Sequence, residues 1–159
     1  MKQQFISAFT IGIVLVAVAV GAVLFMQRGA HMDLTGTMTV KVHPTDPNTS
    51  LASIDLHLTN PASYGFQVSD VTVTLVNKDG KFPVTTVSRV DQQRLAEQMP
   101  ELGPFHPALY TKYTIPAHST GDYTLLAQYS APENIVNART RFVVRIREVN
   151  GTVAELSEK

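Results

Sequence analysis

The chain has 159 residues, with 13 acidic and 13 basic side chains and no cysteine. A nucleic-acid-binding protein is expected to carry a clustered basic excess, which this balance does not provide. The lack of cysteine excludes disulfides, thiolate metal sites, a cysteine nucleophile and a lipid-modified cysteine. Small eukaryotic secreted domains are usually rich in disulfides. The absence of cysteine therefore favours a bacterial or archaeal cell envelope as the location of the chain.

The N-terminal segment Phe5 to Met26 contains 22 residues and no charge. As a helix rising about 1.5 Å per residue it would span about 33 Å, close to the hydrocarbon core of a bilayer. Ala17-Val18-Ala19 resembles the cleavage site of a removable signal peptide, but the apolar run continues beyond it and is longer than such peptides usually have. We therefore predict an uncleaved signal anchor over residues 1–26, which contacts the lipid bilayer as a single transmembrane helix.

The position of this segment also predicts the topology of the protein. Only a few residues precede the apolar run, and a short basic N-terminus usually stays in the cytoplasm. We expect residues 27–33 to be a juxtamembrane linker and residues 34–159 to form one domain outside the cytoplasm. The predicted location is the cell membrane, in single-pass topology.

Two strand patterns begin this domain. Leu34 to Val42 and Ala52 to Leu58 each alternate apolar or small side chains with polar ones, which is typical of half-buried strands. The stretch "HPTDPNTS" (His43 to Ser50) contains two prolines and several turn formers. We expect it to end the first strand and to connect it to the second.

Asn60-Pro61 interrupts the next alternating stretch. Proline cannot donate to a sheet ladder, and asparagine can bond its own downstream backbone, so we predict that the strand ends here in a turn. A new strand is expected over Tyr64 to Leu75. Its apolar phase shifts at Ser69-Asp70, which predicts a β-bulge, and Asn77 to Gly80 is typical of a hairpin turn.

Ser88 to Leu102 is rich in helix formers. Ser88 followed three residues later by Asp91 resembles a capping box, and Pro100 is expected to end the helix after two or three turns. We expect this helix to cross between two sheets.

Further strand patterns follow the helix. They cover Leu109 to Ile115, Tyr123 to Tyr129 and Thr140 to Ile146. Asn150-Gly151 is a strong turn signal that is expected to fold Thr152 to Leu156 back onto the preceding strand. About seven short strands with turns between them predict a mainly β fold, an immunoglobulin-like antiparallel β-sandwich with one short helix.

Two stretches carry a resemblance to a known family. "IDLHLTNPASYGFQVSDVTVTLV" and, later, "TIPAHSTGDYTLLAQY" resemble the late-embryogenesis-abundant type 2 domain, also called the WHy domain. That family shares an Asn-Pro pair after a strand and an "I-P-x-x-S" turn before another, although Ala62 stands here where the family usually has a second asparagine. The resemblance implies a sandwich that acts by binding or structural support, without catalytic residues.

Catalytic and metal-binding motifs are not evident. The five histidines are His31, His43, His57, His106 and His118, and none is spaced as in common metal sites. Asp55 and His57 share one strand face, but no third ligand is near them in sequence. There is no GxSxG elbow and no glycine-rich phosphate loop, so we predict a protein that is not an enzyme and needs no metal, cofactor or small-molecule substrate.

Four arginines form the most distinctive pattern. Arg139, Arg141, Arg145 and Arg147 fall on one face of the last long strand, opposite its apolar residues. One interpretation is a basic ribbon that binds an anionic partner or anionic lipid headgroups. The other is an edge strand protected from aggregation by charge, with Glu148 and Glu155 available to neutralise the arginines.

These observations predict a membrane-anchored extracytoplasmic binding or structural module of the cell envelope with a protein partner there. The alternative is an accessory subunit of a larger membrane protein complex, held through its transmembrane helix.

Overall fold

The computed structural model describes residues 16, 18, 20, 21, 34–103 and 105–158. In the N-terminal part, Val16, Val18, Val20 and Gly21 are helical. No helix within the described residues is both long and apolar enough to cross a bilayer. The predicted anchor over Phe5 to Met26 lies almost entirely outside the described residues, as does the linker 27–33, and both stay predictions.

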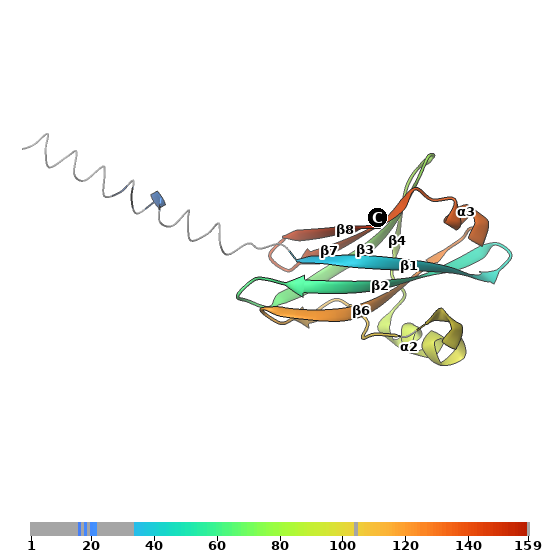
Figure 1. The fold of residues 1–159 in the computed structure, drawn as a ribbon, viewed down its shortest axis with the longest axis horizontal. Helices are drawn as coiled ribbons and strands as arrows, with labels where there is room; N and C mark the ends of the chain where they lie inside the picture. The colour runs from blue at the N-terminus through green and yellow to red at the C-terminus, as the bar shows by residue number, and fades with distance from the viewer. Residues whose placement is uncertain (1–15, 17, 19, 22–33, 104, 159) are drawn as a thin grey trace, which may run out of the picture. The chain divides into compact units, whose positions relative to one another are not determined.

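Residues Asp33–Lys159 form one compact unit, and its described part is mainly β with two antiparallel sheets (Figure 1). The three-stranded sheet has the order β1 (Thr35–Asp46), β2 (Thr49–Asn60), β6 (Ser119–Tyr129). The five-stranded sheet has the order β4 (Gly80–Thr85), β3 (Phe66–Asn77), β7 (Arg141–Glu148), β8 (Val153–Ser157), and β5 (Thr114–Ile115) pairs with β3. The helical elements of this part are α2 (Arg89–Gln98), the 3₁₀ turn η1 (Pro100–Leu102) and α3 (Glu133–Asn137). The predicted mainly β class is confirmed.

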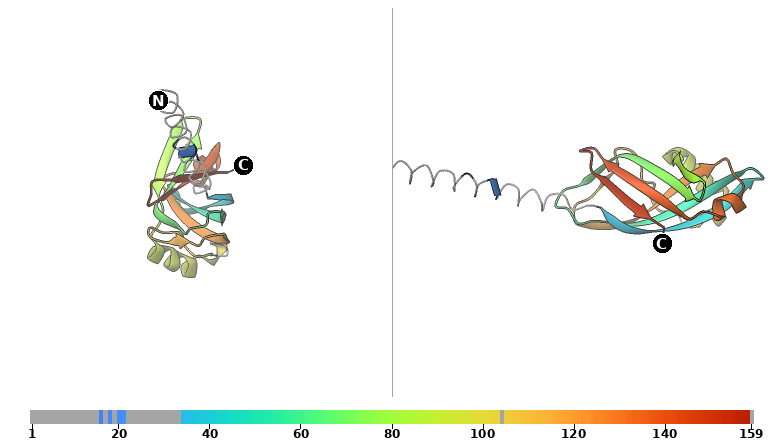
Figure 2. Two further views of the ribbon diagram at one scale, coloured as in Figure 1. Left: turned by 90° about the vertical axis from the view of Figure 1, so that its left-hand side faces the viewer. Right: turned by 90° about the horizontal axis from the view of Figure 1, so that it is seen from above.

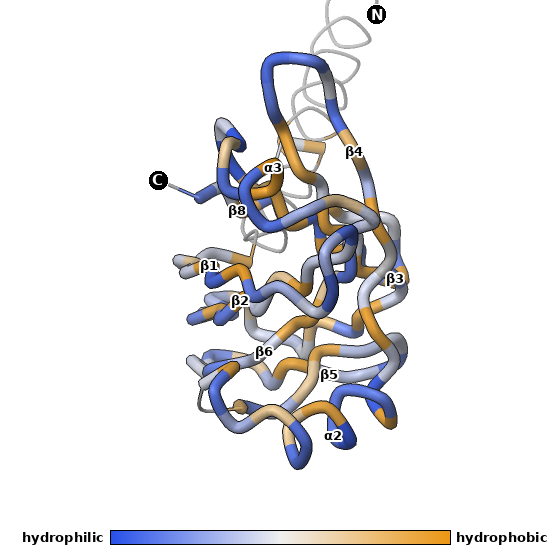
Figure 3. Tube along the Cα trace, turned by 90° about the vertical axis from the view of Figure 1, so that its right-hand side faces the viewer, coloured by the Kyte–Doolittle hydropathy of each residue, from blue (hydrophilic) through white to orange (hydrophobic). Residues whose placement is uncertain are grey.

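The two sheets enclose one apolar core. Alternate residues of each strand point into it, as the period of two predicts. The largest fully buried side chains include Ile54 and Leu56 of β2, Leu125 of β6, and Phe142 and Ile146 of β7. In the left view of Figure 2 and in Figure 3, α2 and the β3–β4 hairpin lie at opposite ends of the layered strands.

The first hairpin is longer than the sequence indicates. The predicted break at His43 to Ser50 is wrong in extent, because β1 continues to Asp46 and β2 begins at Thr49. β1 is the outer strand of its sheet, and an outer strand tolerates a proline whose missing N–H faces away from the ladder. The register shifts between Pro44 and Asp46, where the strand adapts to that proline.

The strand end at Asn60-Pro61 is confirmed. β2 stops at Asn60, whose side-chain oxygen accepts a hydrogen bond from the Ala62 backbone N–H at 3.1 Å. The Asn60 amide nitrogen donates to the backbone oxygens of Ile115 at 3.2 Å and Pro116 at 3.0 Å. The Asn-Pro pair and the Ile-Pro turn, far apart in sequence, therefore meet at one buried amide.

The predicted β-bulge is also confirmed. Val68 pairs with Glu148 and Asp70 with Arg147, so Ser69 is the extra residue. Its hydroxyl donates to the backbone oxygen of Arg147 at 3.1 Å, which holds the bulge against β7. The bulge restores the inward direction of the apolar side chains after the phase shift in the sequence.

One expectation for the second half is wrong. Only Thr114–Ile115 of the strand predicted over Leu109 to Ile115 is extended, because Lys112 has a φ of 73° and the chain turns there. The helix lies in the connection that leads from β4 of the five-stranded sheet to β6 of the three-stranded sheet, as expected of a segment that crosses between the sheets. It packs on the outer face of the three-stranded sheet, where its apolar side chains join a second buried cluster. The turn at Asn150-Gly151 and the pairing of β8 with β7 are confirmed.

Candidate binding surfaces

Helix α2 is fixed at its start and along its length by polar contacts. Ser88 caps the helix as predicted, since its hydroxyl oxygen accepts from the Asp91 N–H at 3.2 Å. The Asp91 carboxylate accepts from the Ser88 hydroxyl at 2.6 Å. Gln92 is buried, and its side-chain nitrogen donates to the backbone oxygen of Thr124 in β6 at 2.9 Å. Helix α2 ends before Pro100, as predicted.

A small second core holds α2 on the outer face of the three-stranded sheet. Its buried members are Leu51 of β2, Leu126 of β6 and Leu102 of η1. Leu95 and Met99 pack against them. Burial of these side chains away from water stabilises the docked position of α2.

The segment that follows α2, residues 105–113, is attached to β6 as well. Ala108 bridges Thr124, and the Thr124 N–H donates to the backbone oxygen of Pro107 at 3.3 Å. The Thr124 hydroxyl accepts from the His106 N–H at 3.0 Å. One residue of β6 thus anchors both α2 and the segment opposite it.

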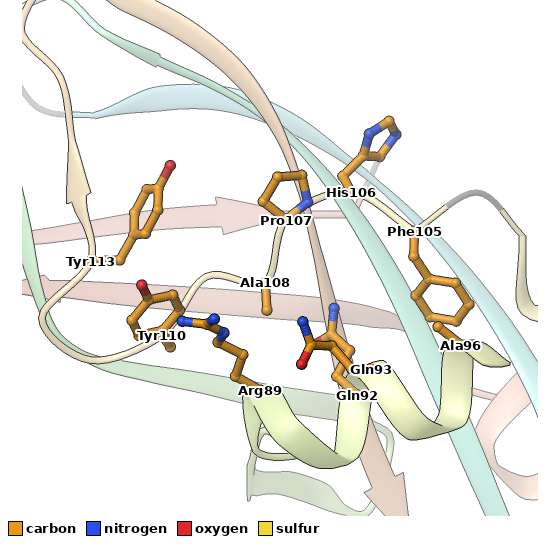
Figure 4. A pocket seen from close by; sticks show the side chains of 10 residues that line it. All are labelled: Arg89, Gln92, Gln93, Ala96, Phe105, His106, Pro107, Ala108, Tyr110 and Tyr113. Atoms are coloured by element: carbon orange, nitrogen blue, oxygen red, sulfur yellow. The ribbon is translucent and has the colours of Figure 1, made fainter.

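Between α2 and residues 105–113 lies an open groove of about 540 Å³, here called the α2 groove (Figure 4). Its volume is within the range of small-ligand sites. The groove is lined by Arg89, Gln92, Gln93 and Ala96 from α2, and by Phe105, His106, Pro107, Ala108, Tyr110 and Tyr113 from the opposite segment.

Tyrosine rings form one side of the α2 groove. Tyr110 and Tyr113 meet edge to face with ring centroids 5.5 Å apart and an interplanar angle of 67°. Tyr113 meets Tyr123 of β6 in the same way, at 5.5 Å and 75°. Burial, and after it the contact with Tyr113, raises the pKa of Tyr123. The Tyr110 and Tyr113 rings therefore form an angled wall.

Arg89 supplies the charge of the α2 groove. Its guanidinium carbon lies 5.1 Å from the centroid of the Tyr110 ring, a cation–π distance, and Figure 4 shows the two side chains together. None of the described residues that line the groove carries a carboxylate. Within the described residues Arg89 has no ion-pair partner, whereas Arg94, on the same helix, pairs with Asp91 at 3.8 Å.

A smaller polar hollow of about 200 Å³ shares His106 with the α2 groove. The His57 ring nitrogen Nδ1 and the Asp122 carboxylate lie 2.6 Å apart across β2 and β6, and this hydrogen bond lowers the pKa of Asp122. Asp55 also lines the hollow and accepts from the Thr124 hydroxyl at 2.9 Å. The described part of the chain contains no group of three or more histidines and carboxylates arranged to hold a metal ion.

The four arginines of the predicted ribbon do not share one environment in the structure. The edge-strand interpretation is wrong, because β7 lies between β3 and β8 and is paired on both sides. Arg139 precedes β7 and is mostly buried, with its Nε and Nη2 at 2.8 and 2.6 Å from the two carboxylate oxygens of Glu158. It also covers the Phe142 ring at 4.8 Å. Arg139 is therefore a structural residue.

The other three arginines, Arg141, Arg145 and Arg147, are exposed on β7. Arg145 pairs with Glu155 of β8 at 2.7 Å, as the sequence suggested. Glu148 is buried and forms no ion pair with a described arginine. Binding of an anionic partner by this face stays a prediction, and a test should change Arg141, Arg145 and Arg147 while leaving Arg139 intact.

Replacing Arg139 with serine is expected to lower the free energy of unfolding by about 1–3 kcal/mol at pH 7. The contact with Arg139 holds the pKa of Glu158 below its ordinary value of 4.5. This stabilisation is complete above pH 4.5 and is lost as the pH falls through the lower pKa of the folded state. Urea unfolding between pH 7 and pH 3 should show a loss of stability on acidification that is smaller in the R139S variant.

The matched control is Arg145→Ser, whose ion pair is exposed and is expected to contribute about 0–1 kcal/mol. Equal losses at pH 7 for the two variants would contradict a special role for Arg139.

Comparison with known proteins identifies no family for the chain. No protein-family model and no curated protein matches the chain. Among solved structures, it is similar to a crystal structure of the "Putative ApaA Protein" from Bordetella pertussis, with 15% identity, 80% of this chain and 89% of that chain covered, and a TM-score of 0.40. At this TM-score the likeness carries no argument about fold or function.

Sequence reasoning missed the α2 groove. The tyrosines and Arg89 are separated by a helix and a loop, and no local motif joins them. The usable signal was the set of aromatic residues after the helix, Phe105, Tyr110 and Tyr113, in a segment that was predicted partly as a strand.

Proposed function

We propose that the chain is a membrane-anchored, extracytoplasmic, non-catalytic binding or structural module of a bacterial or archaeal cell envelope. The binding function rests on one observation, the α2 groove, a concave site with aromatic walls and a few polar side chains. Hydrogen bonds to Thr124 of β6 hold both sides of the groove, from Gln92 on α2 and from His106 on the opposite segment. The groove is therefore formed without a ligand. The uncharged run Phe5 to Met26 supports the anchor.

We also propose that the domain is an immunoglobulin-like sandwich related to the WHy domain. The two antiparallel sheets around one core support the sandwich. The relation is supported by Asn60, which joins the Asn-Pro pair to the Ile-Pro turn through hydrogen bonds to Ile115 and Pro116. Ser119, the last residue of that turn motif, donates from its hydroxyl to the backbone oxygen of Pro116 at 2.7 Å.

Affinity capture of the full chain from its native membrane in mild detergent tests this function. We expect one envelope protein to be retained by the wild type, and to be lost from a Tyr110→Ala variant that still folds. Replacing Val90, an exposed α2 residue outside the groove, with alanine is the control and should leave capture unchanged. The absence of a retained protein would contradict the binding function.

The same preparation separates the alternative. An accessory subunit held through its transmembrane helix would migrate as a stable larger assembly, and capture would survive the Tyr110 variant. A lone species near the 17.4 kDa monomer mass would speak against the accessory subunit.

A further inference from the structure

The electrostatics of the α2 groove select for a negative ligand. Among the described residues that line the groove, Arg89 is the fixed charge and none is acidic. The guanidinium lies over the Tyr110 ring, and no hydrogen bond within the described residues uses its N–H groups, which remain able to donate. A guanidinium presents paired donors that match a carboxylate, so a carboxylate is the group this position recognises best.

The remaining lining residues match a peptide. Gln92 is already bonded to Thr124, but no hydrogen bond within the described residues occupies the side chain of Gln93. A primary amide both donates and accepts, and can therefore pair with the N–H and C=O of a peptide group. Phe105 and Pro107 add apolar surface beside it, which suits an apolar or aromatic side chain of the ligand.

A sugar acid fits this surface less well. Sugar rings pack on flat, open aromatic faces, whereas Tyr110 and Tyr113 meet at 67° and form a corner. The face of Tyr110 is also covered by the Arg89 guanidinium. The arrangement therefore favours a peptide over an anionic glycan.

A neighbouring hollow of about 310 Å³ continues the groove past Arg89. It shares Arg89, Ala108 and Tyr110 with the α2 groove and is also lined by Asp70. A bound chain can extend in that direction, but Asp70 would repel a second acid there.

We propose that the α2 groove binds a peptide segment of a partner protein in which a carboxylate lies next to an aromatic or large apolar side chain. The carboxylate contacts Arg89, Gln93 pairs with the ligand backbone, and the apolar side chain packs between Phe105 and the tyrosine wall. This inference rests on the proposed binding function and specifies its ligand.

The test is an NMR titration of the ¹⁵N-labelled full chain in detergent with short peptides. The probes are acetyl-Gly-Phe-Glu-Gly-amide, its Gln counterpart without the charge, and acetyl-Gly-Gly-Phe with a free C-terminal carboxylate. We expect shifts at residues 89–113 and a Kd of about 1 mM or tighter for at least one acid peptide. The Gln peptide should bind about tenfold more weakly than the Glu peptide, and the comparison of the two acid peptides shows whether the carboxylate comes from a side chain or a chain end.

Variants of the chain locate the carboxylate contact. Arg89→Gln should weaken binding of the acid peptide about tenfold and remove the preference over the Gln peptide. Arg94→Gln, on the same helix but outside the groove, should stay within about twofold. A ¹⁵N spectrum that keeps the wild-type dispersion shows that each variant is folded.

Several results would overturn the inference. These are no shift at about 5 mM peptide, equal binding of the acid and Gln peptides, equal losses in the two arginine variants, and tighter binding of a hyaluronan tetrasaccharide than of either acid peptide. If native-membrane capture is lost in the Tyr110→Ala variant but none of these peptides binds, the proposed binding function stands and only its ligand is wrong. If capture persists in the Arg89→Gln and Tyr110→Ala variants, the groove is not the binding site, as the accessory-subunit alternative expects.

Discussion

Replacement of Asn60 by alanine is expected to lower the free energy of unfolding by about 3–5 kcal/mol. Asn60 is only 1% exposed, and its amide nitrogen lies 2.9 to 3.2 Å from three backbone oxygens, those of Tyr64, Ile115 and Pro116, which share its two N–H donors. Alanine removes these bonds and leaves buried carbonyls without this donor, at about 1–3 kcal/mol for each buried group left unsatisfied. Urea denaturation followed by far-UV circular dichroism measures the loss.

Two further variants separate hydrogen bonding from volume. Asn60→Asp keeps the shape but directs a carboxylate at carbonyl oxygens, so it should destabilise at least as strongly as alanine at pH 7. Asn134→Ala, exposed in α3, is the control and should change stability by less than about 0.5 kcal/mol. A well-tolerated aspartate would show that the Asn60 donor bonds contribute little.

Replacement of Phe142 by alanine is the second change with a large expected effect, about 3–5 kcal/mol. Its side chain is fully buried between the sheets, 5.8 Å from the Tyr129 ring and beneath the Arg139 guanidinium at 4.8 Å. Truncation removes the buried ring and leaves a cavity that the neighbouring strands cannot fill without shifting. The same urea experiment measures it.

Phe82 of β4 provides the matched control. Its side chain is 45% exposed, so Phe82→Ala should cost less than about 1 kcal/mol. Similar losses for both phenylalanines would contradict the position of Phe142 in the core.

Features of the fold that depend on neighbours in sequence were predictable. Asn60-Pro61 ends a strand because proline cannot donate to a ladder, the bulge at Ser69 follows from a phase shift, and Ser88 begins a helix because its hydroxyl replaces a missing acceptor. Each of these signals acts within three or four residues, and the strand end, the bulge and the helix start that they predict are present in the structure.

Features that depend on distant partners were not predictable. The residues of β7 alternate as predicted, but alternation does not show whether a strand has one neighbour or two, so the sequence could not exclude the edge-strand interpretation of this strand. The ion pair of Arg139 with Glu158 and the stacking of Arg89 on Tyr110 likewise join segments that meet only after the sheets form. The helix beside the candidate site was therefore predictable from the sequence, whereas the groove itself was visible only in the tertiary structure.

The pairing of β2 with β6 has a consequence for the rate of folding. Ser50 pairs with Tyr129 and Asn60 with Ser119, so every rung of this ladder closes a long loop of chain. Closing such loops costs entropy before the contacts are formed, and sheets with this kind of non-local pairing fold in about milliseconds to seconds. During that time the β1–β2 hairpin can form alone with Ile54 and Leu56 unburied, so the arrival of β6 sets how long this apolar surface stays exposed to other chains.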